Sequence, residues 1–169
     1  MTDLDQELKQ IAGLPFEDDR FDNMPYSLLH YPAFQAHLNV LLEEEGCHLE
    51  QPPKKGTKGY RNWDSSIGFN AFDLQRHTAS VDEHTDDVSK GRYFGLYVLK
   101  ANGAGVSSRR SKYFDTRTEL RYIDQFKSKQ RTRLDQGTLL VFNPRMKHEL
   151  IHFGDLTLFA LFDVKKVKK

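Results

Sequence analysis

Three residues of the chain have the types and the order that suit a bound metal ion. His84, Thr85 and Asp86 form a His-x-Asp triplet, and His148 follows later in the chain. In an extended chain, side chains two residues apart point to the same side, so His84 and Asp86 can reach one metal from a single strand end. His148 comes after an apolar run and a turn that contains Pro144, which places it at another strand end. Two imidazoles and one carboxylate commonly hold iron(II) with open positions. We therefore predict that His84, Asp86 and His148 are the metal ligands and the catalytic residues.

The metal prediction rests on the combination of these residues and on the strands around them. A His-x-Asp triplet by itself is usually a hydrogen-bonded surface pair. His77, seven residues before the triplet, is interpreted as structural. After residue 65, however, short aliphatic and aromatic runs are bounded by Gly, Asn, Asp or Pro, which is typical of strands. These runs are residues 67–74, 93–100, 119–123, 138–142 and 156–164. Several such strands in succession predict a sandwich or barrel, and the last run, apolar on both faces, is expected in the middle of it.

The first fifty residues have helical spacing instead. One short helix is predicted from the apolar face of Leu4, Leu8 and Ile11, and it ends at Gly13. A second helix begins at Pro32 and ends near Gly46. Its apolar face is formed by Phe34, Leu38, Leu41 and Leu42. We predict one mainly β domain over residues 1–169, with a helical support at 1–50 and a jelly-roll catalytic core, a double-stranded β-helix, at 65–165. The helices are expected to pack outside the jelly roll.

Composition narrows the class of protein. The chain has 169 residues and a net charge of +1, so its overall field indicates neither a nucleic acid nor a membrane as partner. Basic clusters between Arg109 and Arg133 could steer a polyanion, but the balancing acids argue against a nucleic-acid partner. A single cysteine, Cys47, fits a reducing compartment. The acidic N-terminus lacks the apolar run of a signal peptide, and no run is long enough to span a membrane, so we expect a cytoplasmic protein.

From about Arg76 to Val164 the chain resembles the iron(II)- and 2-oxoglutarate-dependent oxygenases, particularly their prolyl-hydroxylase-like branch. The resemblance lies in the His-x-Asp triplet, a Gly-Arg followed by an aromatic strand, a Glu-Leu-Arg strand, and a Leu-Leu-x-Phe segment that leads to a distal His-Glu. In this chain those segments are 84–86, 91–100, 119–123, 139–142 and 148–149. The resemblance implies that iron(II) is the cofactor and 2-oxoglutarate the co-substrate. It also implies that decarboxylation of 2-oxoglutarate is coupled to hydroxylation of a substrate C–H bond.

One departure from that family affects the co-substrate. The family places an Arg or Lys about ten residues beyond the distal His to bind the far carboxylate of 2-oxoglutarate, and this chain has Leu156, Thr157 and Leu158 there. A carboxylate in a dry pocket needs a paired charge or several donors. Lys100 could supply the charge, because it lies two residues after Val98 and so on the same face of the strand. It could equally end the strand in solvent. Arg121 is a weaker substitute.

The predicted co-substrate residues are therefore Lys100, Tyr97 and Thr157. The substrate stays open among a protein side chain, a nucleic acid and a small molecule. Two alternatives also stay open: a cupin-like metal enzyme that does not use 2-oxoglutarate, and a non-enzymatic jelly-roll binding domain.

Overall fold

The strands of the protein account for most of its regular structure. The computed structural model describes residues 2–16, 25–51, 55–57, 67–77, 81–88, 91–102, 119–124, 126–151 and 156–167. Its helices are α1 (Asp3–Ala12), the 3-10 helix η2 (Leu28–His30) and α2 (Pro32–Glu44). Its strands are β1 (Tyr26–Ser27), β2 (Cys47–Leu49), β3 (Ala71–His77), β4 (Val81–His84), β5 (Tyr93–Asn102), β6 (Glu119–Ile123), β7 (Lys129–Arg133), β8 (Leu139–Phe142), β9 (His148–Ile151) and β10 (Leu156–Lys166).

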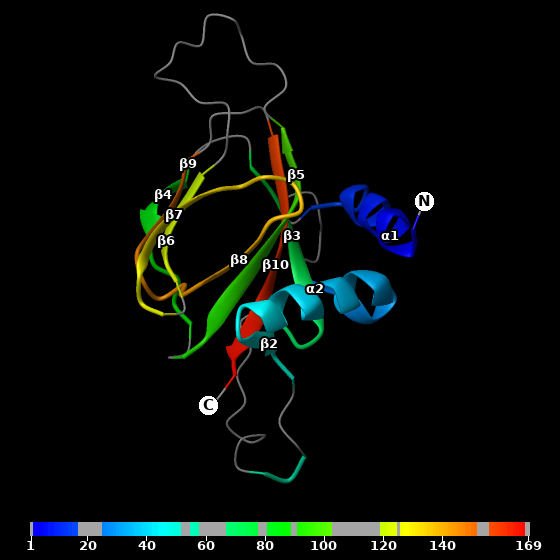
Figure 1. Cartoon of the computed structure of the whole chain (residues 1–169), viewed down its shortest axis with the longest axis horizontal. Coiled ribbons are helices and arrows are strands. Elements are labelled where there is room, and N and C mark those ends of the chain that lie inside the picture. The colour runs from blue at the N-terminus through cyan, green and yellow to red at the C-terminus, as the bar shows by residue number, and fades with distance from the viewer. Residues whose placement is uncertain are drawn as a thin grey trace, which may run out of the picture.

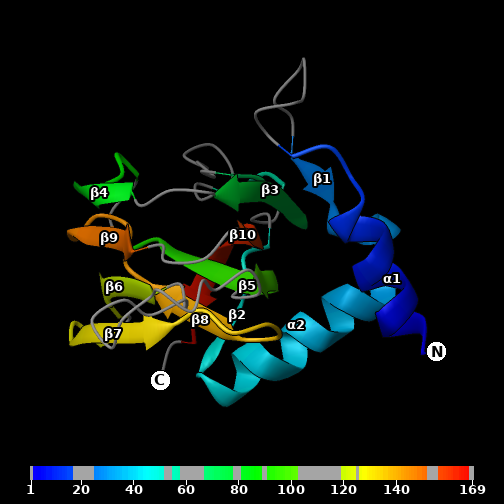
Figure 2. The same cartoon turned by 90° about the horizontal axis from the view of Figure 1, so that it is seen from above.

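The strands form two antiparallel sheets. The larger sheet has the order β1-β3-β10-β5-β8, with β2 also paired to β10, and the smaller has the order β4-β9-β6-β7. Figure 2 shows the smaller sheet stacked in this order on one side of the molecule. Along the chain, β3, β5, β8 and β10 belong to the larger sheet and β4, β6, β7 and β9 to the smaller. This exchange between two sheets is the winding of a jelly roll. The predicted fold class, a mainly β jelly roll with N-terminal helices outside, is confirmed.

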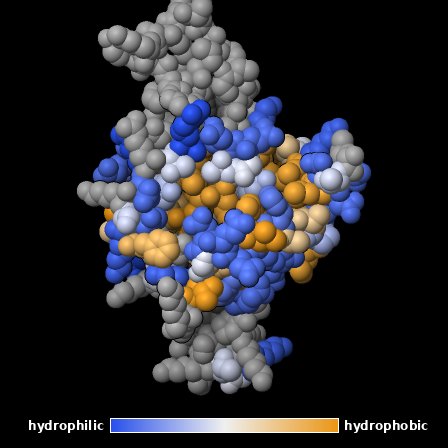
Figure 3. All heavy atoms as spheres, viewed as in Figure 1, coloured by the Kyte–Doolittle hydropathy of each residue, from blue (hydrophilic) through white to orange (hydrophobic). Residues whose placement is uncertain are grey.

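The larger sheet has an apolar core on each face, and its side chains alternate between the two. On β5, Phe94, Leu96 and Val98 pack in the apolar layer between the two sheets, while Tyr97 and Leu99 pack in the layer beneath the helices. The helices lie against the larger sheet, away from the smaller one (Figure 1). The strand predicted to lie centrally, β10, pairs with β2, β3 and β5. Figure 3 shows hydrophobic residues exposed among hydrophilic ones across the middle of one face.

Helix α1 holds the start of α2 through one carboxylate. The backbone N–H groups of Ala33 and Phe34 donate to Glu7 at 3.1 and 2.9 Å. The first N–H groups of a helix lack partners within the helix and favour a negative charge. Tyr31, the residue before α2, makes no side-chain capping bond, so Glu7 supplies the cap from another element. In the described part of the chain, no helix is long and apolar enough to cross a membrane.

The start of one strand differs from the sequence prediction. The strand predicted over residues 67–74 begins at Ala71, because Asn70 adopts a left-handed φ of 51° that turns the chain before it. The backbone N–H groups of Ile67 and Gly68 instead donate to the carboxylate of Asp163 in β10, at 2.8 and 3.2 Å. The described chain also contains β4, β7 and β9, which the apolar pattern did not predict.

The close contact of β5 with β10 makes Gly95→Ala a strongly destabilising substitution. A Cβ atom on Gly95 would lie 2.3 Å from the ring of Phe162 and 2.9 Å from Cγ2 of Val164. Both neighbours are fully buried, and overpacking of this kind costs about 1–3 kcal/mol of unfolding free energy. Urea denaturation measures the loss. Gly13→Ala is the matched control, because its Cβ would meet nothing closer than 3.6 Å, and we expect a change below about 0.5 kcal/mol. Equal stability of the two variants would contradict this packing.

Candidate metal centre

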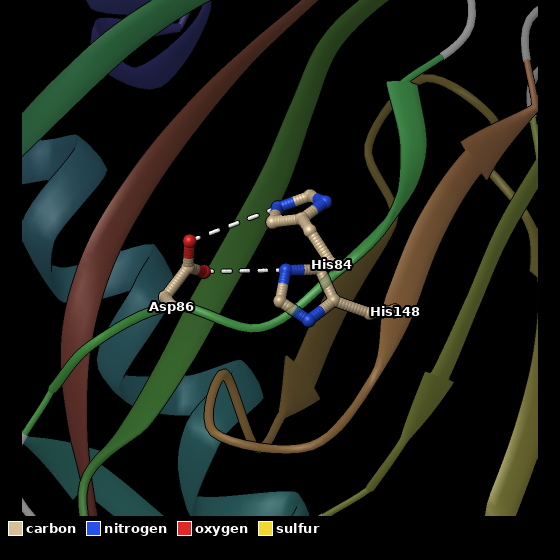
Figure 4. A group of neighbouring side chains, drawn as sticks. All are labelled: His84, Asp86 and His148. Atoms are coloured by element: carbon tan, nitrogen blue, oxygen red, sulfur yellow. Dashed lines mark ion pairs between the residues drawn. The ribbon is translucent and has the colours of Figure 1, made fainter.

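Strands β4 and β9 bring the two predicted histidine ligands together. In their antiparallel register His84 lies opposite His148, and the centroids of the two imidazole rings are 4.3 Å apart. Asp86 lies just beyond the end of β4, and its backbone N–H donates to the carbonyl oxygen of Pro144 at 2.8 Å. This bond joins the segment that carries Asp86 to the turn before His148. The three side chains therefore converge although they come from distant parts of the chain (Figure 4).

The separations of the side-chain atoms fit a single bound ion. Oδ1 of Asp86 is 3.7 Å from Nε2 of His84, and Oδ2 is 3.2 Å from Nε2 of His148. One nitrogen or oxygen from each residue lies within 4.8 Å of the others. Atoms that share one first-row metal at about 2.1 Å each are at most about 4.2 Å apart. Small side-chain rotations therefore suffice to place all three around one ion.

Both imidazoles are oriented by backbone carbonyls. Nδ1 of His84 lies 2.8 Å from the carbonyl oxygen of Asp82, and Nδ1 of His148 lies 2.8 Å from that of Met146. A carbonyl only accepts, so each Nδ1 carries a hydrogen, which leaves each Nε2 as the atom that would bind a metal. Metal-binding histidines usually have such a partner, which fixes both the tautomer and the ring orientation.

The centre is buried on one side and accessible on the other. The side chain of His148 is 6% exposed, and its ring packs against that of Phe142 at a centroid distance of 5.1 Å. His84 and Asp86 keep 40% and 35% of their side-chain surface exposed. A bound ion would thus be held firmly from the interior and would keep a side on which other ligands can approach.

A cavity of about 290 Å³ extends from the three residues into the space between the sheets. None of the described residues that line it is Lys or Arg, and most are apolar. Besides His84, Asp86 and His148, they are Gln75, His77, Val81, Phe94, Leu96, Leu120, Phe142, Leu150, Phe159 and Leu161. This composition suits an uncharged molecule of small size.

The structure does not bring Tyr97 to this cavity. Tyr97 belongs to the layer beneath the helices, where its ring packs edge-on against Phe34 at 5.3 Å and its hydroxyl lies 3.4 Å from Nε2 of His37. Burial raises the pKa of Tyr97. Successive residues of a strand face opposite sides, so Tyr97 faces away from the cavity that Leu96 lines, and its position does not support a co-substrate role.

The structure does not place Lys100 in the lining either. The pairing of β5 with β10 shifts between Leu158 and Phe159, so that Phe159 is opposite Val98 while Leu158 is opposite Lys100. Such an irregularity interrupts the alternation of side chains, which was the basis for placing Lys100 on the cavity face. Lys100 is exposed. The backbone of Thr157 pairs with His77 and Ala101, and its side chain lies outside the described part of the structure.

A separate groove of about 710 Å³ shares His148 with the cavity and contains Arg121. Arg121 donates to Glu149 at 3.1 Å, and Lys147 lies 3.8 Å from Glu83, so both cations have carboxylate partners. Arg145 also lines this groove. Of the basic clusters considered above, residues 109–112 lie outside the described residues.

Gln75 and His77 are cavity residues that the sequence interpretation missed. The sequence predicts a structural role for His77 and does not single out Gln75, because neither has metal-ligand spacing. The signal available was their position on the strand before the His-x-Asp triplet, where alternate residues face the space between the sheets.

Comparison with known proteins finds solved structures that are similar at low sequence identity. No model of a protein family and no curated protein matches the sequence. Among solved structures, a cupin-2 domain containing protein from Shewanella frigidimarina is 11% identical, with a TM-score of 0.34 over 61% of this chain and 78% of that one. Fe(II)-HppE, solved with the alternative substrate (S)-1-HPP, is also 11% identical, with a TM-score of 0.32 over 72% of this chain and 60% of that one. The jelly-roll assignment therefore rests on the strand order, and the assignment of a metal site on the geometry of the three residues.

Proposed function

We propose that this protein is a mononuclear iron(II) oxygenase that oxidises an organic molecule bound between its two sheets. The observation that carries the proposal is the convergence of His84, Asp86 and His148 at the wall of a cavity. Two imidazoles and a carboxylate with open positions are the ligand set of non-haem iron(II) oxygenases. An iron(II) ion held there would supply the activation of oxygen, which amino-acid side chains cannot provide.

The protein's own residues would orient the ion and keep water from the substrate. The carbonyl oxygens of Asp82 and Met146 hold the two imidazoles, so that both Nε2 atoms face Asp86. Aromatic rings line the interior side, with Phe94 and Phe142 in edge-to-face contact at 6.0 Å. An apolar wall of this kind excludes water from an oxidising centre and favours reaction with the bound molecule.

The charges around the centre favour an oxygenase that does not use 2-oxoglutarate. One carboxylate of that co-substrate could bind the metal, but the other would lie in the cavity, whose described lining has no cation. An unpaired carboxylate in an apolar site is costly. The cupin-like alternative, in which the organic substrate itself occupies the cavity, has no such requirement.

Hydroxylation driven by 2-oxoglutarate is the second candidate, and one observation favours it. Arg145 lies in the groove that shares His148 with the cavity, and no described carboxylate is paired with it. Its guanidinium could bind the far carboxylate if the co-substrate extended into the groove rather than into the cavity. Lys100 is the other cation that we propose for this role.

Nitric oxide, a stand-in for oxygen, tests the proposal without knowledge of the substrate. It binds iron(II) that has an open position and gives a characteristic electron paramagnetic resonance signal. We expect this signal from the iron-loaded protein and its loss in His148→Ala. The variant His48→Ala, which alters an exposed histidine on β2, serves as the control and should keep the signal. A protein that binds iron but not nitric oxide would point to the third possibility, a binding domain without oxygenase activity.

Addition of 2-oxoglutarate to the same samples separates the two oxygenase candidates. We expect no change in the nitric oxide signal and no release of carbon dioxide. If 2-oxoglutarate does bind, the second candidate is correct. Two variants then identify the residue that holds its far carboxylate. Affinity for 2-oxoglutarate should fall about ten- to a hundredfold in Arg145→Met or in Lys100→Ala, whichever removes that residue.

A further inference from the structure

The cavity has a second polar end on the wall opposite the candidate metal centre. His84 and His148 belong to strands of the smaller sheet, whereas Gln75 and His77 belong to β3 of the larger sheet and line the same cavity. Nε2 of His77 lies 3.2 Å from Oε1 of Gln75, so the two side chains form one polar pair. Nothing in the proposed chemistry of the metal requires this pair, which raises the question of what it binds.

The pair is held in a fixed orientation. The ring of His77 stacks on that of Phe159, with centroids 5.1 Å apart and planes inclined by 8°. Phe159 lies directly opposite Gln75 in the register of β10 with β3, and partners across a strand pair share one face of the sheet. Gln75 therefore points toward the same interior space as Phe159. Among the described residues, no group accepts a hydrogen bond from the amide nitrogen of Gln75, so this donor is available to a ligand.

The space between the two polar ends restricts the size and charge of a ligand. Its walls include Leu96, Leu120, Leu150 and Leu161, and none of its described lining residues is Lys or Arg. A charged group away from the metal would therefore lack a partner. A volume of about 290 Å³ equals that of roughly ten water molecules. A ligand of about ten non-hydrogen atoms would fill it.

We propose that the substrate is a small, neutral and mainly apolar molecule with one carbonyl, amide or hydroxyl group. Gln75, whose side chain His77 holds in place, donates a hydrogen bond to that group, and the apolar body of the molecule extends toward His84, Asp86 and His148. This inference rests on the proposed function in one respect, namely that the far end of the molecule is where oxidation takes place. The recognition by Gln75 and His77 is an independent statement about the cavity.

Three benzene derivatives serve as probes of this recognition. Benzamide is neutral and has an amide group, toluene lacks a polar group, and benzoate is charged. Calorimetry on the manganese(II)-loaded protein should show that benzamide binds most tightly. In Gln75→Leu and in His77→Leu, benzamide affinity should fall about three- to tenfold, the effect of one lost neutral hydrogen bond, while toluene affinity is unchanged. Gln51→Leu, an exposed glutamine outside the cavity, is the control and should bind benzamide like the wild type.

The outcomes separate this inference from the proposed function. Two results would overturn the inference alone. One is an equal loss of benzamide and toluene affinity in Gln75→Leu, and the other is no benzamide binding by a protein that holds manganese(II). Benzamide binding with the expected dependence on Gln75 in a protein that holds no metal would overturn the proposed function and leave the recognition standing. Manganese(II) affinity should be unchanged in Gln75→Leu, because Gln75 is not a ligand.

Discussion

Replacement of Arg92 with methionine is expected to lower the free energy of unfolding by about 3–5 kcal/mol, the cost of removing one partner from a buried ionic group. Arg92, Glu50 and Asp163 are all more than nine-tenths buried. The Arg92 guanidinium contacts the Glu50 carboxylate directly and lies 4.0 Å from that of Asp163. Without Arg92, two buried carboxylates would remain, with Lys165 at 3.9 Å from Glu50 and the N–H groups of Ile67 and Gly68 on Asp163 as partners that compensate only in part.

The loss of stability in Arg92→Met should depend on pH. The pKa of Glu50 determines whether this loss grows or shrinks as the pH rises. Burial raises the pKa of Glu50, and the positive charge of Arg92 opposes that rise. Removing Arg92 raises this pKa further. A carboxyl whose pKa is higher in the folded than in the unfolded state loses stability as the pH rises through the folded value. Arg92→Met should therefore be less destabilised near pH 5 than near pH 8.

Urea denaturation at both pH values measures these effects. Arg133→Met is the matched control, since Arg133 and Asp135 form a surface pair at 3.7 Å whose side chains are about half exposed or more. Pairs of this kind contribute about 0–1 kcal/mol. If Arg92→Met proves too unstable to purify, the double variant Glu50→Met/Arg92→Met, which removes the pair together, should regain part of the loss. Equal stability of Arg92→Met and Arg133→Met would contradict the role assigned to the buried group.

The second large effect is expected at the metal centre. His148→Ala removes the most buried of the three proposed ligands, and metal affinity should fall by more than about a hundredfold. This exceeds the loss that is typical when a residue beside a ligand, rather than the ligand itself, is changed. A metal at a hundred times its dissociation constant stabilises the folded state by about 2.7 kcal/mol. The melting temperature of the wild type should therefore rise on addition of manganese(II), while that of His148→Ala stays constant. A rise of equal size in both would contradict the assignment of His148 as a ligand.

The convergence of the three site residues was predictable because it depends on spacing and order. His84 and Asp86 lie two residues apart at a strand end, and the chemistry of two imidazoles with a carboxylate is independent of the details of the fold. The register that places His148 opposite His84 could not be read from the sequence, since it depends on pairing between segments far apart in the chain. The bonds from Nδ1 to carbonyl oxygens could not be read either, because they involve the backbone.

Strands with few apolar residues account for most of what the sequence did not reveal. Strand β7, Lys-Gln-Arg-Thr-Arg, pairs only with β6, and β4, Val-Asp-Glu-His, pairs only with β9, within the described sheets. Charged residues on edge strands prevent unwanted pairing with other chains, and they also remove the apolar pattern by which strands are recognised. The side on which Lys100 lies could not be predicted either, because simple alternation does not continue through the irregularity between β5 and β10.

The most direct test of the account is a count of iron(II) ions bound per chain under anaerobic conditions. Equilibrium dialysis of the wild type should give about one tightly bound ion, and His48→Ala should give the same. The double variant His84→Ala/His148→Ala should bind none at the same concentration of free iron, while circular dichroism shows that its strands are intact. One ion per chain in that double variant, or no specific ion in the wild type, would contradict the assignment of His84, Asp86 and His148 as a metal centre.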